Sequence, residues 1–370
     1  MRVLHVIDSF NRGGAETLAL DMLKKARDHG IEMSILSTGT GELLEEFRAI
    51  ASNIASVTRK LPVDVAVAGA IREFVKEKEI QIVHCHQPVE GIHAFIGTIG
   101  LDVRRVLTVH GSAFDKRNRL ALRFLAPRMH TNIAVSNAQL DILLGKRYIR
   151  SRDNWQVVYN GVDAAKLSCT SRQLRIELGL QREELLLGMI ANFVRGKDPL
   201  TVCHALPHVF RQFPKTQFAF VGTWNEGARH LYDECVKQCE SEGIAGRVHF
   251  LGRRRDIADV LASMDIFLLS SIEDTFGLAA VEAMLVGVPT VLSDIASFRE
   301  ISGEGSAASL FRTGDPLDLA LKLAHLVQHA GERAALSKRA KTWALSRFTI
   351  GEHILELKKV YEGLLIAMSH

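Results

Sequence analysis

The sequence predicts an α/β protein with two doubly wound parallel sheets, each in its own domain. The chain has 370 residues, of which 47% are hydrophobic and 24% charged. This length favours two domains, because single hydrophobic cores stop growing at roughly 250 to 300 residues. Short apolar runs alternate with amphipathic stretches of helical period, which is typical of a parallel sheet covered by helices on both faces. The alternation restarts after a polar stretch around residues 164–172.

The apolar runs define the expected strands in chain order. In the first half they are residues 3–7, 33–38, 80–85, 105–110, 132–136 and 155–159. In the second half they are residues 185–191, 217–222, 247–251, 265–270, 289–293 and 307–311. Helices fill the intervals, a helical pattern covers 316–347, and a last amphipathic run covers 350–367. We therefore expect domains at 1–165 and 166–347, with a ligand bound between them at the carboxyl ends of the strands.

Composition and charge exclude several classes of protein. The 46 basic and 42 acidic residues give a net charge of +4, which is too mild to predict a nucleic-acid-binding protein. No apolar run approaches the roughly 18 residues of a membrane span, and the start, MRVLHVID, is too short an apolar stretch for a signal peptide. We expect a cytoplasmic protein. The odd number of cysteines, without framework spacing, indicates reduced thiols at Cys85, Cys169, Cys203, Cys235 and Cys239.

The loop after the first strand, SFNRGGAET at residues 9–17, is a candidate phosphate site. Gly13 and Gly14 allow close approach of a ligand to the backbone, and the helix start behind them offers N–H groups and a positive dipole end. A tight turn explains the two glycines equally well. Because the full dinucleotide fingerprint is absent, we expect no nicotinamide cofactor, and no other cofactor is indicated.

The corresponding turn of the second domain is ANFVRGKDP, residues 191–199. Lys197, just before a helix start, could meet a diphosphate, and Arg195 adds a second cation. A solvated surface lysine is the alternative, and it is favoured for Lys197 taken in isolation.

Two carboxylates flank the glycine of SSIEDTFGLAAVEAM, residues 270–284. If a helix runs from about Phe276, Asp274 and Glu282 lie roughly 12 Å apart along its axis, about the extent of a nucleotide-sugar from sugar hydroxyls to ribose. Carboxylates accept hydrogen bonds from hydroxyls, and the helix start supplies donors to phosphates. The alternative is a helix N-cap plus a helix-face glutamate, which accounts for Asp274 but leaves Glu282 on a mostly apolar face.

His84 and His86 lie two residues apart on one expected strand and therefore share a face, with Cys85 on the other. Such a pair invites a zinc site, but zinc takes three or four ligands and the spacing suggests no third. We expect no metal, and we expect His86 to line the cleft.

Residues 115–130 form a basic amphipathic segment. It combines cations and apolar residues: Lys116, Arg117, Arg119, Arg123, Arg128, Leu120, Leu122, Phe124 and Leu125. Such a helix could rest on an anionic membrane surface and deliver a lipid-linked acceptor. A solvated helix whose leucines face the core is the alternative, which the pattern slightly favours.

Several short motifs follow one another in a specific order. They are GGAE at 13–16, IVHCH at 82–86, TVHG at 108–111, AVSNAQ at 134–139, YNGVD at 159–163, the Lys197 turn, FVG at 220–222, VHFLG at 248–252 and EAMLVGVPTVLSD at 282–294. Each is weak alone. Together, over essentially the whole length, they give a chain that resembles the family-4 retaining glycosyltransferases of the GT-B fold.

The resemblance implies a role for each candidate residue. His110 would lie beside the donor sugar, and Lys197 would neutralise the diphosphate. Asp274 would bind the sugar hydroxyls and Glu282 the ribose, while Gly13 and Gly14 would approach the donor phosphate and the acceptor. Further substrate-binding positions would be His86, Asn160, Asn192, Arg195, Glu273, Thr275, Phe276, Gly277 and Leu278.

This chain departs from the family pattern at two positions. The family usually has Glu where this chain has Asp274, and Glu273 stands one residue earlier. It also usually has an arginine where this chain has Asn192. We expect Arg195 to supply the missing positive charge.

The expected function is retaining transfer of a hexosyl unit from a UDP- or GDP-sugar to a glycan or lipid-linked acceptor, in cell-surface polysaccharide or lipopolysaccharide synthesis. It needs no metal and takes place in the cytoplasm at the inner face of the plasma membrane. The final helix, within 348–370, would cross back to the first domain, as in the family. Alternatives on the same fold are a nucleotide-sugar 2-epimerase, a phosphorylase, or a non-catalytic nucleotide-sugar-binding protein.

Overall fold

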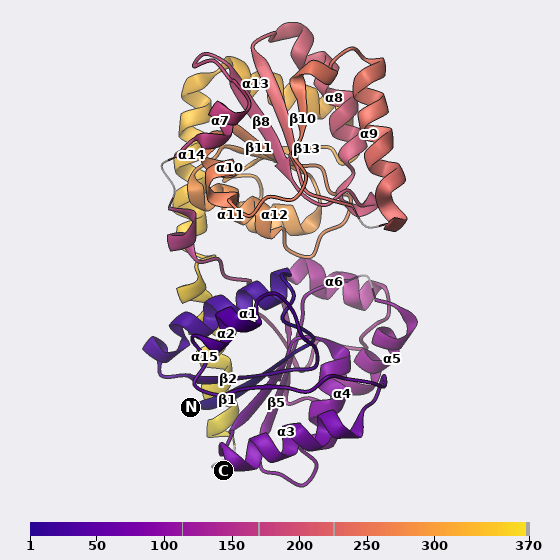
Figure 1. Cartoon of the computed structure of the whole chain (residues 1–370), viewed down its shortest axis with the longest axis vertical. Coiled ribbons are helices and arrows are strands. Elements are labelled where there is room, and N and C mark those ends of the chain that lie inside the picture. The colour runs from indigo at the N-terminus through magenta and orange to yellow at the C-terminus, as the bar shows by residue number, and fades with distance from the viewer. Residues whose placement is uncertain (113, 169–170, 225, 368–370) are drawn as a thin grey trace. The chain divides into compact units, whose positions relative to one another are not determined.

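The computed structural model describes residues 1–112, 114–168, 171–224 and 226–367, so the predicted thiol Cys169 lies outside the described residues. The chain divides into two compact units (Figure 1). The first comprises Met1–Val162 and the segment from Phe348 onward, and the second comprises Asp163–Arg347. The break after Val162 falls three residues before the expected boundary at 165.

The first unit contains a parallel sheet of seven strands in the order β3-β2-β1-β4-β5-β6-β7. Its strands are β1 (Arg2–Ile7), β2 (Glu32–Ser37), β3 (Ile54–Ser56), β4 (Ile82–Cys85), β5 (Arg104–Val109), β6 (Thr131–Ala134) and β7 (Trp155–Val157). Its helices are α1 (Gly14–Lys25), α2 (Leu44–Arg48), α3 (Val65–Glu77), α4 (Pro88–Gly97), α5 (Lys116–Leu125), α6 (Asn137–Gly145) and α15 (Ile350–Ile366). The sequence did not predict β3, because this three-residue edge strand has no fully buried side chain and so no apolar run.

The sheet of the first unit is covered on both faces. One core cluster joins apolar residues of β1 to α1 and to Ile354, Leu357 and Tyr361 of α15. A second cluster, on the other face, joins β1, β4 and β5 to α3 and α5. The carboxyl-terminal helix thus completes the core of the first unit, since burial of its apolar stripe against α1 is the main force that holds it there.

The second unit contains a parallel sheet of six strands in the order β10-β9-β8-β11-β12-β13. Its strands are β8 (Leu185–Ile190), β9 (Thr216–Val221), β10 (Val248–Phe250), β11 (Ile266–Leu269), β12 (Thr290–Ser293) and β13 (Ser309–Phe311). Its helices are α7 (Gln173–Glu177), α8 (Pro199–Gln212), α9 (Arg229–Ser241), α10 (Ile257–Ser263), α11 (Leu278–Val286), α12 (Ala296–Ser302), α13 (Pro316–Gln328) and α14 (Ala330–Leu345). The continuous helical pattern expected over 316–347 is interrupted at His329, whose ψ of 83° is not helical.

All twelve predicted strands are present and the predicted fold class, two doubly wound parallel sheets, is confirmed. In each sheet the strand order reverses at one place, between β1 and β4 in the first unit and between β8 and β11 in the second. Ligands of open parallel sheets bind at this reversal, beyond the carboxyl ends of the strands. The two reversals therefore decide which loops carry the chemistry.

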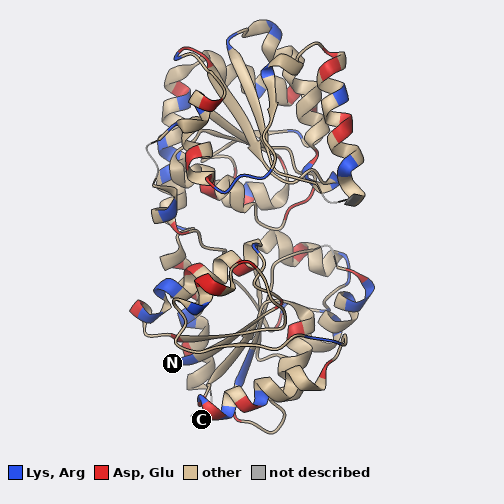
Figure 2. Ribbon diagram, in the orientation of Figure 1, with Lys and Arg blue, Asp and Glu red and all other residues tan. Residues whose placement is uncertain are grey.

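Charged residues cover the outer helices of both units, whereas most strands are free of them (Figure 2). This distribution is what two sheets buried on both faces require. Within the described part of the chain, no helix combines the length and apolar character needed to cross a membrane. The cysteines described, Cys85, Cys203, Cys235 and Cys239, are all buried free thiols.

Candidate functional site

The loops that follow β8 and β11 in the second unit are bonded to each other. The hydroxyl of Ser270 donates to the carbonyl oxygens of Lys197 and Asp198, at 2.9 and 2.8 Å. The backbone N–H of Ile272 donates to the carbonyl of Gly196 at 2.9 Å. Because β8 and β11 are neighbours at the reversal of strand order, the two loops leave the sheet side by side. The fold therefore holds the lysine turn against the segment that leads into α11.

Lys197 and Asp274 form an ion pair across these loops. Nζ of Lys197 lies 2.5 Å from Oδ2 of Asp274, and the two side chains are 28% and 11% exposed. The other carboxylate oxygen, Oδ1, accepts the backbone N–H of Phe276 at 3.3 Å. A partly buried charge-assisted pair of this kind fixes both side chains at the carboxyl edge of the sheet.

The start of α11 differs from the sequence expectation. The helix begins at Leu278 rather than near Phe276, because Gly277 has a left-handed φ of 91°. A Cβ at Gly277 would also lie only 2.6 Å from the ring of Phe298, so this position requires glycine. Asp274 is therefore in a loop and is not the N-cap, and the helical rise cannot give its distance from Glu282.

The other candidates of this segment are placed as follows. Leu278 opens α11 and Glu282 stands half-buried in its second turn, whereas Phe276 is 2% exposed and belongs to the core. Glu273 is exposed and Thr275 half-buried in the preceding loop. The N-cap of α11, Gly277, follows Asp274 by three residues and makes no side-chain capping bond, so no described side chain caps the positive dipole end of this helix.

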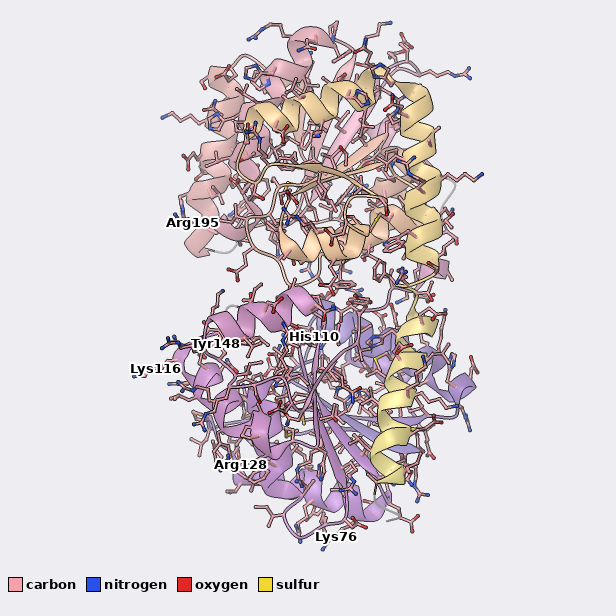
Figure 3. All side chains as sticks on the ribbon, turned by 180° about the vertical axis from the view of Figure 1, so that it is seen from behind. Lys76, His110, Lys116, Arg128, Tyr148 and Arg195 are labelled. Carbon is pink, nitrogen blue, oxygen red and sulfur yellow. The ribbon has the colours of Figure 1, made fainter. Side chains whose placement is uncertain are left out.

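Arg195 and Asn192 lie on the lysine loop but in different surroundings. The exposed Arg195, labelled in Figure 3, lines a cavity of about 810 Å³ together with Asp198, His230 and Glu234. Asn192 is exposed, and its Oδ1 accepts the N–H of Thr223 at 3.3 Å. Arg195 is therefore on the lysine loop, as the sequence requires, and it lines a cavity whose lining, among the described residues, includes neither Lys197 nor Asp274. That Arg195 replaces the family's arginine stays a prediction.

In the first unit, Gly13 and Gly14 lie at the start of α1. Gly13 is its N-cap and makes no side-chain capping bond. The carboxylate of Glu16 occupies the space beside Gly13, only 2.4 Å from where a Cβ would be. Burial raises the pKa of Glu16. The predicted helix start after β1 is present, and the carboxylate of Glu16 lies beside its N-cap, Gly13.

Three further candidates lie together at the carboxyl edge of the first sheet. His86 is 3% exposed, and its Nδ1 lies 3.0 Å from Nε2 of His110. Burial lowers the pKa of His110 to about 4, and a hydrogen bond with Asn160 opposes this shift. Among the described residues, Oδ1 of the buried Asn160 has no hydrogen-bond partner.

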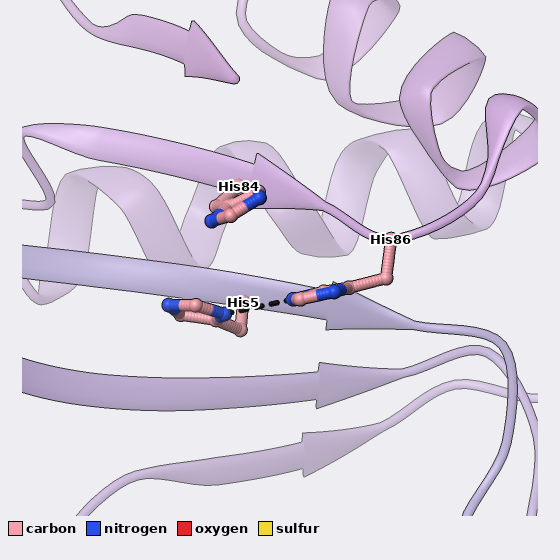
Figure 4. A group of neighbouring side chains, drawn as sticks. All are labelled: His5, His84 and His86. Atoms are coloured by element: carbon pink, nitrogen blue, oxygen red, sulfur yellow. Dashed lines mark hydrogen bonds between the residues drawn. The ribbon is translucent and has the colours of Figure 1, made fainter. Parts of the chain in front are cut away.

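The structure also shows two buried residues that the sequence did not predict as site residues. His5 of β1 pairs in register with His84 of β4, and its Nδ1 lies 2.9 Å from Nε2 of His86 (Figure 4). It is the third imidazole that the spacing of His84 and His86 did not reveal. Alternation along β1 places His5 among apolar neighbours, which was the available signal.

The second is Glu90 of α4, which is 1% exposed and bonded to Arg59 at 2.8 Å. Burial, with the nearby charge of Asp8, raises the pKa of Glu90 to about 7. Its position in the apolar stretch PVEGIHAF resembles that of Glu282 in α11, and this was the signal that could have found it.

Each half of the chain matches a known protein family. Residues 12–166 match the family described as Glycosyltransferase Family 4, and residues 170–343 match Glycosyl transferases group 1. The N-acetyl-alpha-D-glucosaminyl L-malate synthase of Bacillus anthracis is 24% identical over 95% of this chain and 94% of its own. A phosphatidyl-myo-inositol mannosyltransferase of Mycolicibacterium smegmatis is 22% identical over 95% and 90%.

Solved structures share the fold. The crystal structure of Anabaena HepE in complex with UDP and glucose has a TM-score of 0.83 at 22% identity, covering 98% of this chain and 99% of that one. A glycosyltransferase from Rickettsia africae has a TM-score of 0.85 at 15% identity, covering 98% of both chains. With two matched families, full-length relatives and a shared two-sheet architecture, the chain belongs to the family-4 glycosyltransferases of the GT-B fold.

Proposed function

We propose that this glycosyltransferase moves a hexosyl unit, with retention of configuration and without a metal ion, from a UDP- or GDP-sugar to a glycan or lipid-linked acceptor. The relatives support the donor class, because HepE is known in complex with UDP and glucose. They support the acceptor class through the phosphatidyl-myo-inositol mannosyltransferase. The proposed setting is cell-surface polysaccharide or lipopolysaccharide synthesis.

The observation that carries the proposal is the ion pair of Lys197 and Asp274 beside the start of α11. A diphosphate there would take over Lys197 as its cation and accept hydrogen bonds from the free N–H groups of the helix. Asp274, released from the lysine, would accept hydrogen bonds from the sugar hydroxyls. Glu282 would bind the ribose, and Arg195 would add a second cation.

The chemistry asks mainly for stabilisation of the leaving group. The bond between the anomeric carbon and the phosphate oxygen breaks, and the acceptor oxygen bonds to that carbon on the same face. The acceptor proton passes to an oxygen of the departing phosphate. Because negative charge develops on this phosphate in an oxocarbenium-like transition state, Lys197, Arg195 and the helix start lower the barrier. In the proposal His110 contacts the donor sugar near its anomeric carbon.

Peripheral contact with the cytoplasmic face of the plasma membrane is part of the proposal. Leu122 and Leu125 of α5 are buried, as the core alternative requires, but Leu120 and Phe124 are 60% and 43% exposed. Lys116 and Arg128 lie on the same side of the first unit (Figure 3). Exposed apolar side chains flanked by cations are the combination that binds an anionic lipid surface.

Calorimetric titration with UDP and GDP tests the donor site. We expect the wild-type protein to bind one of the two selectively and Lys197→Ala to lose that binding. Lys215→Ala is the matched control, because Lys215 is an exposed lysine of the same unit that pairs with Glu183. Failure of both nucleotides to bind the wild type would contradict the proposal. Binding without transfer to any acceptor would favour a non-catalytic nucleotide-sugar-binding protein.

A further inference from the structure

A chain of hydrogen-bonded side chains runs through the core of the first unit to His110. Its imidazole contacts are Nε2 of His110 to Nδ1 of His86 at 3.0 Å, and Nε2 of His86 to Nδ1 of His5 at 2.9 Å. The hydroxyl of Tyr361, on α15, lies 3.5 Å from Nε2 of His5 and 2.5 Å from Nδ1 of His84. Nε2 of His84 reaches the hydroxyl of Thr108 at 2.7 Å.

The arrangement fits a hydrogen-bond chain better than a metal site, although His5, His84 and His86 are close enough to be considered as ligands. Two nitrogens bound tetrahedrally to one zinc ion at 2.0–2.1 Å are about 3.3 Å apart. The contact between His5 and His86 is shorter, at 2.9 Å, and a dashed line marks it in Figure 4. Both ring nitrogens of His84 already have hydroxyl partners.

The imidazoles of the chain are uncharged at neutral pH. Burial lowers the pKa of His5 to about 3 and that of His110 to about 4, and it holds the pKa values of His84 and His86 well below their usual range. A neutral imidazole has one N–H donor and one acceptor nitrogen. Each ring in the chain can therefore donate on one side only and must accept on the other.

This restriction gives the chain a single direction. If His86 donates to His110, then His5 donates to His86, and Tyr361 donates to His5 while accepting from His84. If the direction is reversed, every proton moves to the opposite partner, and His110 donates from Nε2. Nδ1 of His110 is a donor in the first arrangement and an acceptor in the second. The hydroxyl of Tyr361 is the link between His84 and His5, so both ends are coupled through it.

We propose that Tyr361 is a positioning residue that couples the tautomer of His110, through His86 and His5, to the direction of the hydrogen bonds that His84 makes with Tyr361 and Thr108. The helix that crosses back to the first unit is thereby coupled to whether Nδ1 of His110, the nitrogen that does not contact His86, carries an N–H group or a lone pair. Tyr361 touches no substrate in this account. The effect on turnover rests on the function proposed above, whereas the effect on the tautomer does not.

The test is long-range 1H–15N correlation of histidine-labelled protein without substrate, which distinguishes Nδ1–H from Nε2–H imidazoles. We expect one tautomer of His110 in the wild type, and a mixture or the opposite tautomer in Tyr361→Phe. Thr108→Val removes the hydroxyl at the far end with little change of shape, and we expect the same direction of change. Tyr148→Phe is the control, because it deletes a hydroxyl in the same unit at a ring that packs on Phe114.

Activity then separates the two proposals. We expect Tyr361→Phe to lower kcat by about tenfold, the loss typical of an outer partner of a functional imidazole, with the KM for the donor unchanged. An unchanged His110 tautomer in both folded variants would overturn the inference whatever the activity. A shifted tautomer in a protein whose wild type transfers no sugar would uphold the inference and contradict the proposed function.

Discussion

Nζ of Lys197 lies 2.5 Å from Oδ2 of Asp274, although the two residues are 77 positions apart in the chain. The pair joins the loops at the reversal of strand order in the second sheet, where a ligand of this fold is expected. In the proposed cycle the diphosphate and Asp274 compete for one ammonium group. This competition separates the roles of the two residues experimentally.

Asp274→Asn removes the competitor while keeping the side chain's shape. We expect UDP or GDP to bind at least as tightly as to the wild type, because Lys197 no longer has to leave a carboxylate. We expect transfer from the nucleotide-sugar to fall by about tenfold or more, because a hydrogen bond to a charged group contributes about 1.5–3 kcal/mol. Calorimetry and a transfer assay measure the two effects. Loss of nucleotide binding in this variant would show that Asp274 holds the loop rather than the sugar.

Arg195→Ala tests the replacement of the family's arginine, which is Asn192 here. We expect turnover to fall by about 10- to 100-fold, since a cation is removed from the developing charge on the diphosphate. Arg229→Ala on α9 is the control, because Arg229 is an exposed arginine of the same unit paired with Asp233. If Arg195→Ala kept full turnover while Lys197→Ala abolished it, Arg195 would have no part in the site.

The buried imidazoles make stability depend on pH. Burial lowers the pKa of His353 from 6.5 to about 4. Burial also lowers the pKa of His5 to about 3 and that of His110 to about 4. Below pH 6.5 the unfolded chain binds protons that the folded chain does not, so stability is full above this pH and falls as the pH decreases toward 4. Each such histidine contributes a slope of about 1.4 kcal/mol per pH unit in the free energy of unfolding.

Urea unfolding at pH 7.5, 6.5 and 5.5 measures this slope. Nδ1 of His353 contacts the carbonyl of Tyr159 at 2.6 Å, and His353→Gln keeps a donor for this carbonyl. This variant should reduce the slope of the free energy of unfolding by the contribution of one histidine, about 1.4 kcal/mol per pH unit. His204→Gln, at an exposed position of α8, should leave it unchanged. A slope of zero between pH 6.5 and 5.5 in the wild type would contradict the assignment of neutral buried imidazoles.

Gly161 in the YNGVD motif allows α15 to pass close to the chain. A Cβ there would lie 2.6 Å from Cβ of His353 and 2.8 Å from Cα of Ile350. We expect Gly161→Ala to lower the free energy of unfolding by about 1–3 kcal/mol or more, because backbone and Cβ atoms must move. Gly363→Ala, where nothing lies within 4 Å in α15, should raise it by about 1 kcal/mol. Thermal unfolding of the two variants compares them, and equal effects would contradict the crowding argument.

Flotation with vesicles that contain anionic lipid tests the surface of α5. We expect the wild type to float with the vesicles and the double variant Leu120→Ser, Phe124→Ser to float several-fold less, because insertion of the two exposed apolar side chains is lost. Leu321→Ser on α13, which replaces a leucine that is 67% exposed, is the control. Recovery of no wild-type protein with the vesicles would remove membrane contact from the proposed function.

The sequence by itself determined the class of the fold and twelve of its strands. Strands buried on both faces need continuous apolar runs, and such runs are visible in the order of residues along the chain. The sequence also predicted which loops carry candidate ligand-binding residues, because the paired glycines and the lysine before a helix can be recognised from the local sequence. It missed β3, whose short edge has no buried face, and it placed the start of α11 too early.

Only the tertiary structure decided which distant side chains meet. Lys197 contacts Asp274 because β8 and β11 are neighbouring strands, and His5 contacts His86 because β1 pairs with β4. Tyr361 joins the same chain only because α15 packs against α1. Local periodicity determines the faces of an element, whereas strand order and helix packing determine its neighbours, and a catalytic or binding site is made of neighbours.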